Sequence, residues 1–364
     1  VYMQKIIISL FIYISVFFTF VHLTRNRNMI QKYDFLVIGS GIAGMSFALK
    51  VAHQGKVAIV CKTKLNDANT SLAQGGIASV TDKSDNFKKH IEDTLICGDG
   101  LCDIKVVEKV VTEAPKQIEE LINWGVDFDK DKKGNFDLHK EGGHSAFRIL
   151  HHKDKTGAEI QESLAKKVKE HPNIDVYEYH FAIDLLTQHQ LGKIITKKTP
   201  NIECYGAYVL DCKTKNIITF LSKITMMATG GIGNVYQITT NPIIATGDGI
   251  AMVHRARGKI SDMEFVQFHP TALYHSTERP SFLITEAMRG YGATLRTKDG
   301  KKFMRKYDER GSLASRDIVA RAIDNEMKSK GDDYVYLDVT EKDAEETKKH
   351  FPNIYEKCLL LGID

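Results

Sequence analysis

The chain has 364 residues, of which 43% are hydrophobic and 26% charged, and its formal net charge is +4. This balance is typical of globular proteins and excludes a disordered or collagen-like chain. The length allows about two domains with buried cores. The surplus of positive charge is small and no run of Lys and Arg stands out, so we expect no nucleic-acid partner.

The cysteines do not form a recognisable metal or redox motif. No pair has C-x-x-C spacing. We therefore expect reduced thiols, as in a cytosolic protein, and no bound metal. The six are Cys61, Cys97, Cys102, Cys204, Cys212 and Cys358.

The N-terminal stretch differs from the rest of the chain. Residues 6–23 contain no Lys, Arg, Asp or Glu, and as a helix these 18 residues would span about 27 Å, just enough to cross a bilayer core of ~30 Å. Lys5 before the stretch and Arg25 and Arg27 after it would leave the C-terminal bulk in the cytoplasm, anchored to the inner face of the membrane. The alternative, which we favour, is that Met29 is the true start and that the protein is cytoplasmic without a targeting segment.

A dinucleotide-binding motif follows at once. Residues 33–38 form a short apolar run typical of a buried parallel strand, and the glycines after it have G-x-G-x-x-G spacing. Gly39 permits a tight turn, Gly41 lets a pyrophosphate approach the backbone, and Gly44 lets the next helix pack against the strand. The diphosphate is then expected at the helix N-terminus. The predicted cofactor contacts here are Gly39, Ser40, Gly41, Ile42, Ala43 and Gly44.

The elements after the glycines complete a βαβ unit. A helix is predicted over about 45–53, Gly55 ends it, and residues 57–60 form a second strand. An acidic residue that binds the ribose is expected at the end of that strand, but Cys61 and Lys62 stand there. The ribose partner therefore stays open, and Lys62 is predicted to contact the cofactor instead.

The next glycine-bearing loop identifies the dinucleotide. Residues 69–78 closely resemble the segment that wraps the isoalloxazine ring in the succinate dehydrogenase, fumarate reductase and L-aspartate oxidase flavoprotein family. In the membrane-complex members a histidine at the position of Asn69 carries the flavin covalently. An asparagine does not form that bond, so the resemblance implies non-covalent FAD. The implied flavin contacts are Asn69, Thr70, Ser71, Leu72, Ala73, Gln74, Gly75 and Gly76.

The resemblance extends from residue 33 almost to the end of the chain. Residues 224–231 read as a strand with a glycine turn, and residues 246–249 open another helix. They imply flavin-site roles for Thr229, Gly230 and Asp248. The implied fold is α/β, a Rossmann-like FAD-binding domain (29–257) with an inserted smaller α+β capping domain (258–364), after the apolar leader (1–28).

Two segments of the predicted cap resemble substrate-binding motifs. Residues 264–271 match a motif whose histidine, here His269, binds a substrate carboxylate. Thr285 and Glu286 match substrate-pocket residues. Glu286 is also placed to pair with Arg289 at i,i+3 on a helix, which would be a purely structural role.

The catalytic arginine of the family falls on Arg316. Ser315 is predicted to cap an apolar-striped helix that includes residues 318–327, which places Arg316 in the first turn, where anions are favoured. In the fumarate and succinate enzymes this arginine carries the proton. From local sequence alone, a surface arginine beside Asp317 fits equally well.

Residues 138–145 distinguish substrates within the family. This segment resembles the L-aspartate oxidase form, in which the glutamate at position 141 faces the substrate ammonium. The dicarboxylate enzymes carry an uncharged residue there. An added cation favours a buried anion, because an unpaired buried charge is costly. Ala146 and Phe147 depart from the basic or polar residues common in the family.

The resemblance implies FAD-dependent oxidation of L-aspartate to iminosuccinate by hydride transfer to the flavin, with catalytic residues Glu141, His269 and Arg316. O2 or fumarate would reoxidise the flavin, and the product would feed quinolinate synthase in NAD biosynthesis. The alternative is a fumarate reductase or succinate dehydrogenase flavoprotein subunit, which Asn69 and Glu141 oppose. A third hypothesis is a non-catalytic flavin-binding or membrane-anchored remnant.

The chain lacks a further family segment with a second substrate histidine and an arginine near an S-N-S run. In the family that segment also completes the FAD domain. We therefore expect this chain to be a fragment that, alone, binds FAD weakly and turns over little substrate.

Overall fold

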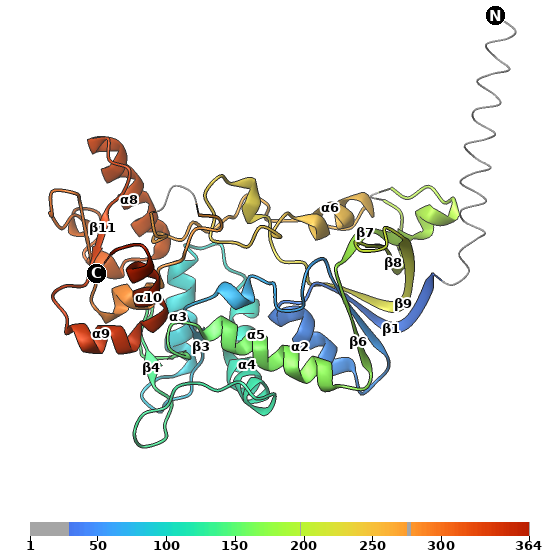
Figure 1. The fold of residues 1–364 in the computed structure, drawn as a ribbon, viewed down its shortest axis with the longest axis horizontal. Coiled ribbons are helices and arrows are strands. Elements are labelled where there is room, and N and C mark those ends of the chain that lie inside the picture. The colour runs from blue at the N-terminus through green and yellow to red at the C-terminus, as the bar shows by residue number, and fades with distance from the viewer. Residues whose placement is uncertain (1–28, 197, 275–277, 364) are drawn as a thin grey trace, which may run out of the picture.

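A six-stranded sheet organises the N-terminal part of the computed structural model, which describes residues 29–196, 198–274 and 278–363 (Figure 1). Its strands are β1 (Ile30–Ile38), β2 (Val57–Cys61), β6 (Ile174–Glu178), β7 (His180–Thr187), β8 (Cys204–Asp211) and β9 (Ile217–Met227). They lie in the order β6-β2-β1-β9-β8-β7. The strands β6, β2, β1 and β9 are parallel, whereas β8 pairs antiparallel with both β9 and β7.

The central strand β1 is buried on both faces. Phe35 and Val37 belong to the apolar core on one face, and Leu36 and Ile38 belong to the core on the other. This explains why the strand reads as a continuous apolar run rather than an alternating one. The first core is covered by α2 (Ile42–Val51), α4 (Ile104–Asn123) and α5 (Thr156–Glu170), and α6 (Asp248–Arg255) packs on the second.

The glycine turn after β1 is built by close backbone contacts. A Cβ on Gly39, whose φ is +111°, would lie 2.1 Å from the carbonyl oxygen of Ala228, and a Cβ on Gly44 would lie 2.1 Å from the carbonyl oxygen of Gly39. Gly41 is the N-cap of α2, so the helix begins at Ile42, three residues before the predicted start. The predicted helix began too far along the chain because Gly44 was assigned to the turn. In the structure Gly44 lies in the first turn of α2, where a side chain would collide with the carbonyl oxygen of Gly39.

We expect Gly39→Ala to lower the free energy of unfolding by about 3 kcal/mol. Left-handed backbone costs an L-residue about 1–2 kcal/mol, and forcing a methyl group against a backbone carbonyl oxygen adds about 1–3 kcal/mol. Chemical denaturation measures the change. Gly231→Ala is the matched control, because nothing lies within 4 Å of its added Cβ. Equal stability of the two variants would contradict this account of the turn.

A smaller three-stranded sheet carries the loop of Glu141. It contains β3 (Ile77–Ala78), β5 (Ile149–Leu150) and β4 (Leu138–His139), beside α3 (Phe87–Cys97). Arg148, fully buried, donates to Asp85 from Nε at 2.7 Å and from Nη2 at 2.9 Å, and to Asp93 from Nη1 at 2.5 Å. Asp93 also accepts from the amide of Ser145 at 2.8 Å. The loop that follows Glu141 is therefore anchored by a buried ion-pair network.

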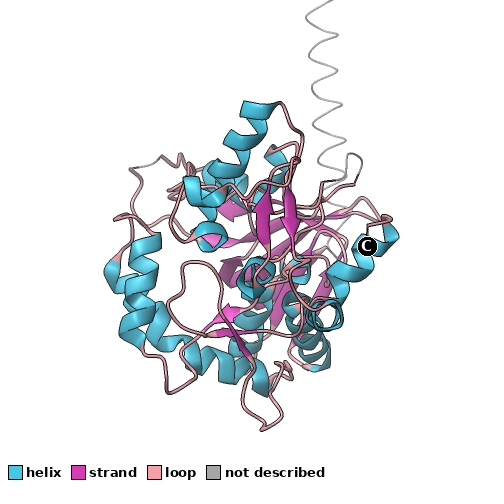
Figure 2. Ribbon diagram, turned by 90° about the vertical axis from the view of Figure 1, so that its left-hand side faces the viewer, coloured by secondary structure: helices cyan, strands magenta, loops and turns pink. Residues whose placement is uncertain are grey.

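The C-terminal segment has its own apolar cores and lies at the opposite end of the molecule from strands β7 and β8 (Figure 1). Its elements are α7 (Glu286–Tyr291), β10 (Thr294–Arg296), α8 (Arg316–Lys330), β11 (Tyr336–Asp338), α9 (Ala344–His350) and α10 (Pro352–Leu360). Strands β10 and β11 pair antiparallel, and Figure 2 views the molecule from this side, with helices around strands. Asp154 joins the two parts by accepting from the amides of Asn353 and Ile354. The predicted α/β fold with a smaller α+β cap is confirmed.

The apolar stretch 6–23 lies outside the described residues. Within the part of the chain that the structure describes, no helix has the length and apolar character needed to cross a membrane. The six cysteines are free thiols.

Candidate active site

A groove of about 350 Å³ lies at the carboxyl ends of the parallel strands β1, β2 and β9. This is where open α/β sheets bind their ligands. Most of the predicted cofactor residues line it: Gly39, Ser40, Gly41, Ile42, Ala43, Lys62, Asn69, Thr70, Thr229, Gly230 and Asp248. Gly44 and residues 71–76 do not line this groove.

The start of α2 fits the diphosphate of a dinucleotide. Its N-cap is Gly41, no side chain caps it, and no acidic residue lies in its first turn. The N-terminal amides and the positive end of the helix dipole therefore face the groove without a competing anion. A Cβ on Gly41 would approach Thr70 Oγ1 to 3.3 Å, so glycine keeps the groove open here.

Lys62 is an ion-pair partner in this groove. Its ammonium pairs with Asp248 and donates to Thr246 Oγ1 at 2.7 Å. The pair joins the end of β2 to the start of α6, 186 positions further along the chain. The predicted cofactor contact of Lys62 thus stays a prediction, and any such contact is made by a lysine whose charge is already balanced.

The loop after Asn69 leads from the groove towards Glu141. Gln74 is buried and its Oε1 has no hydrogen-bond partner. A Cβ on Gly75 would lie 3.3 Å from Glu141 Oε1 and 3.8 Å from Thr285 Oγ1. An unpaired buried oxygen is costly, so Gln74 fits a ligand that brings an N–H donor, as an isoalloxazine ring does. The residues present therefore fit FAD.

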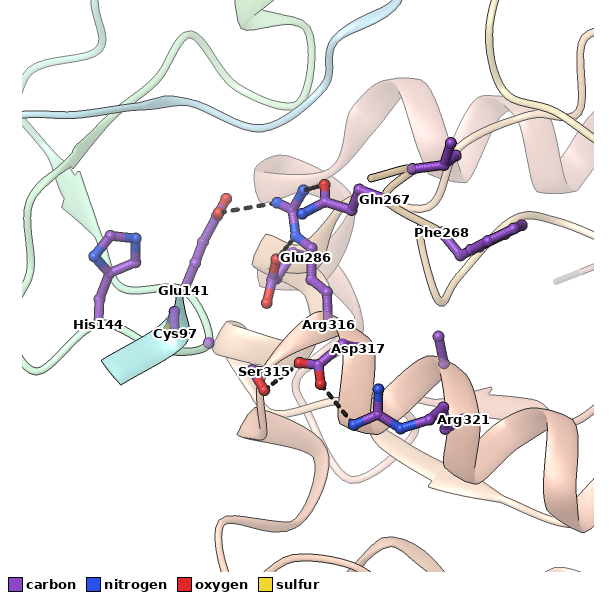
Figure 3. Close-up of a pocket in the computed structure, with 13 residues that line it drawn as sticks. Cys97, Glu141, His144, Gln267, Phe268, Glu286, Ser315, Arg316, Asp317 and Arg321 are labelled. Carbon is purple, nitrogen blue, oxygen red and sulfur yellow. Dashed lines mark hydrogen bonds and ion pairs between the residues drawn. The ribbon is translucent and has the colours of Figure 1, made fainter. Parts of the chain in front are cut away.

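A second cavity, of about 480 Å³, contains a concentrated set of charges (Figure 3). Glu141 comes from the loop after β4, Glu286 from the start of α7 and Arg316 from the start of α8. Arg316 hydrogen-bonds Glu286 through Nε and Gln267 Oε1 through Nη1 at 2.9 Å, and its Nη2 lies 3.7 Å from Glu141 Oε2. Three of the predicted site residues therefore meet in one cavity.

Near pH 7, both the ionised and the protonated form of Glu141 are populated. Burial, and then the nearby carboxylate of Glu286, raise the pKa of Glu141 to about 7, against the opposing influence of Arg316 and Arg289. Its Oε1 is buried and has no hydrogen-bond partner. The site thus offers a buried carboxyl oxygen to a ligand that brings a cation or a donor.

Glu286 makes the predicted helix pair with Arg289 and also lines the cavity, and its role in binding substrate stays a prediction. Glu286 pairs with Arg316, and its Oε1 also lies 3.0 Å from Nη2 of Arg289, one turn along α7. Arg289 is fully buried and donates from Nη1 to the carbonyl oxygen of Ser312 at 2.8 Å. Thr285, itself 1% exposed, caps the helix by accepting from the amide of Ala287. It holds Glu286 in place and does not line the cavity.

His269 lies near the positive charges of Arg316 and Arg289, but it is not among the residues that line the cavity. Burial, then the positive charges of Arg316 and Arg289, lower its pKa to about 3, so the imidazole is neutral at pH 7. Its Nδ1 accepts from the amide of Thr271 at 3.3 Å. The ring proton is therefore on Nε2, which is a donor suited to a carboxylate.

Sequence reasoning did not select Gln267 or Arg289 as functional residues. Gln267 lies two positions before His269 in the same motif, which was the signal available for it. Arg289 was considered only as a helix partner of Glu286. In the structure, Gln267 contacts Arg316 and Arg289 contacts Glu286.

The fold and the charged cavity together indicate the class of protein. The chain has a Rossmann-like dinucleotide-binding fold with a second, charged cavity beneath a cap. A family model described as "FAD binding domain" matches residues 34–364. The chain therefore belongs to the FAD-binding domain family, and its cofactor is FAD.

Proteins named as L-aspartate oxidases are among those similar in sequence to this chain. The chain is 47% identical over 347 residues to the chloroplastic L-aspartate oxidase 2-b of Nicotiana tabacum, a match that covers 93% of this chain and 52% of that protein. It is 48% identical to L-aspartate oxidase 1 of Ralstonia nicotianae, with 92% and 62% covered. The chain thus spans about half the length of the plant relative.

Among solved structures, the fold is similar to that of a point variant of the quinol fumarate reductase of E. coli. The TM-score is 0.81 at 27% identity, and the match covers 92% of this chain and 58% of that one.

Proposed function

We propose that the protein containing this chain oxidises L-aspartate to iminosuccinate with non-covalently bound FAD, and that O2 or fumarate takes up the electrons. The observation that carries the proposal is Glu141, a buried carboxyl group with an unpartnered oxygen in a cavity that also holds an arginine. A dicarboxylate needs cationic partners only. An amino dicarboxylate also needs an anion, and Glu141 supplies it. The high identity to named L-aspartate oxidases supports this assignment.

Different residues of the site bind the ammonium group and the carboxylate groups of the substrate. Glu141, when ionised, binds the ammonium group, and Arg316 together with Nε2 of His269 binds carboxylate oxygens. When bound, FAD would supply the acceptor for the hydride that leaves the α-carbon, and the ammonium group would release a proton as the imine forms. The protein orients that carbon and balances the charges around it.

The contacts of Arg316 also allow it to hold a proton for the reaction. Arg316 and Arg289 flank Glu286, which contacts both of them. This row of alternating charges fixes the fork of Arg316, and its Nη2, which lies 3.7 Å from Glu141 Oε2, is the nitrogen that faces the substrate.

Asn69 supports non-covalent flavin. It lies in the cofactor groove, and a Cβ on Gly230 would approach its side-chain nitrogen to 3.8 Å. An amide nitrogen has no available lone pair for a covalent link to a flavin.

Peroxide release from the full-length protein tests the function. We expect peroxide in air with L-aspartate and none with succinate, and anaerobic turnover of L-aspartate when fumarate is added. Reduction of the bound flavin by succinate would instead establish the second candidate, a fumarate reductase or succinate dehydrogenase flavoprotein. The structural similarity to the E. coli quinol fumarate reductase is the observation that favours that alternative.

We expect the KM for L-aspartate to fall by about tenfold between pH 6 and pH 8. With a pKa of about 7, Glu141 is mostly protonated at pH 6 and mostly ionised at pH 8, and only the ionised form pairs with the ammonium group. Initial rates at several pH values measure this. Glu141→Gln has no group to titrate, so its KM should not vary in this range. A pH profile shared by both proteins would assign the ionisation to another group.

The product has a predictable fate. We propose that quinolinate synthase consumes the iminosuccinate in NAD biosynthesis. A cytoplasmic location stays a prediction.

A further inference from the structure

A second cluster of ligand-type side chains lies on the small sheet that carries the Glu141 loop. Strands β4 and β5 pair antiparallel, with Leu138 opposite Leu150 and His139 opposite Ile149. Continuing this register by one step sets Asp137 opposite His151. Because side chains alternate between the two faces of a strand, Asp137, His139 and His151 share one face.

The structure brings these three side chains together. One oxygen of Asp137 and one ring nitrogen of each histidine all lie within 4.8 Å of one another. The rings of His139 and His151 are stacked, with their centroids 3.5 Å apart and their planes 20° apart. A carboxylate and two imidazoles are the ligands that zinc and similar divalent ions prefer.

His151 provides the second, independent observation. It is only 4% exposed, and neither of its ring nitrogens has a hydrogen-bond partner. Its Nδ1 lies 3.3 Å from an oxygen of Asp129, but in a geometry that does not make a hydrogen bond. A buried imidazole normally satisfies at least one nitrogen, so His151 has the capacity to bind a further partner.

An ion has a route to this cluster. Asp137 and His139 line a cavity of about 780 Å³ that lies between the sheet and the C-terminal segment. His350, at the end of α9, borders the same cavity, with its ring centroid 6.1 Å from that of His139. The open side of the cluster thus leaves room for water or a further ligand.

We propose that Asp137, His139 and His151 bind one divalent transition-metal ion of the zinc type. At bond lengths of roughly 2.1 Å, tetrahedral ligand atoms lie about 3.4 Å apart, so the side chains have to rotate and unstack by a small amount. The ion would hold β4 against β5 and so fix the strand that leads, two residues later, to Glu141. Its role is structural, and it departs from the absence of metal expected from the cysteine pattern.

Zinc retention by the full-length protein tests the proposal. The protein is stripped with a chelator, incubated with Zn²⁺, passed through a desalting column and analysed for zinc by atomic emission. We expect about one zinc per chain, loss of that zinc in His139→Gln, and its return in His139→Cys, because a thiolate is also a zinc ligand. His53→Gln, which replaces an exposed histidine just beyond the C-terminal end of α2, is the matched control and should keep the zinc.

Zinc bound equally by wild type and His139→Gln, or not retained by wild type, would overturn the proposal. A second measurement guards against a variant that fails to fold. The melting temperature of the wild-type protein should rise when Zn²⁺ is added and fall again with chelator, because an ion that binds only the folded state stabilises it. A melting temperature that does not respond to zinc would also overturn the proposal.

Discussion

Replacing Arg316 by lysine should lower kcat for L-aspartate by about a hundredfold to a thousandfold. The guanidinium contacts Glu286 and Gln267 and lies near Glu141 through three different nitrogens. A lysine ammonium is a point charge that does not reproduce this fork. Loss of one preorganised charged donor at a reacting centre costs about 3–4 kcal/mol, and each 1.36 kcal/mol corresponds to tenfold in rate. Steady-state turnover measures the effect.

The amount of bound FAD, read from its absorbance, should stay unchanged in this variant, because Arg316 does not line the cofactor groove. Lys328→Gln is the matched control, since Lys328 lies on the same helix and is exposed. Its kcat should remain within about twofold of wild type, as expected for a surface charge. If Arg316→Lys kept more than a tenth of the wild-type kcat, the arginine would be a surface residue beside Asp317 and no more.

Glu141→Gln should lower kcat/KM for L-aspartate by about a hundredfold to several thousandfold. The variant leaves the substrate ammonium in a cavity whose remaining nearby charges include Arg316, and an unpaired buried charge costs about 3–5 kcal/mol. Succinate has no ammonium group, so its inhibition constant should stay the same or fall. The contrast between the two ligands is measured with initial rates and competitive inhibition.

Glu92→Gln provides the control for Glu141→Gln. Glu92 lies on α3, is exposed, and lies 3.9 Å from Lys88. Its removal should change neither constant. Equal losses of affinity for L-aspartate and succinate in Glu141→Gln would mean that Glu141 supports the cavity without recognising the amine.

The nucleotide-binding part of the fold could be predicted because its determinants are local. The apolar run of β1, the spacing of Gly39, Gly41 and Gly44, and the next strand lie within about 30 residues, and each glycine has a steric reason that any chain would share. The antiparallel pairing of β8 with β7 and β9 was not predicted, since register depends on contacts between separate segments.

The candidate site was predicted less completely for a similar reason. Resemblance selected Glu141, Glu286 and Arg316, which the structure brings together. Gln267 was missed because its role depends on a hydrogen bond to a residue 49 positions away.

The histidine cluster was missed because Asp137 and His151 become neighbours only when β4 and β5 pair. Such contacts carry no signature in local spacing.

The two charges that matter most come from different parts of the chain. Glu141, which would select the substrate, lies on the loop after β4 in the N-terminal part, whereas Arg316 begins α8 of the C-terminal segment. Neither part alone contains a complete site, so recognition and reaction coincide only while the two are held together.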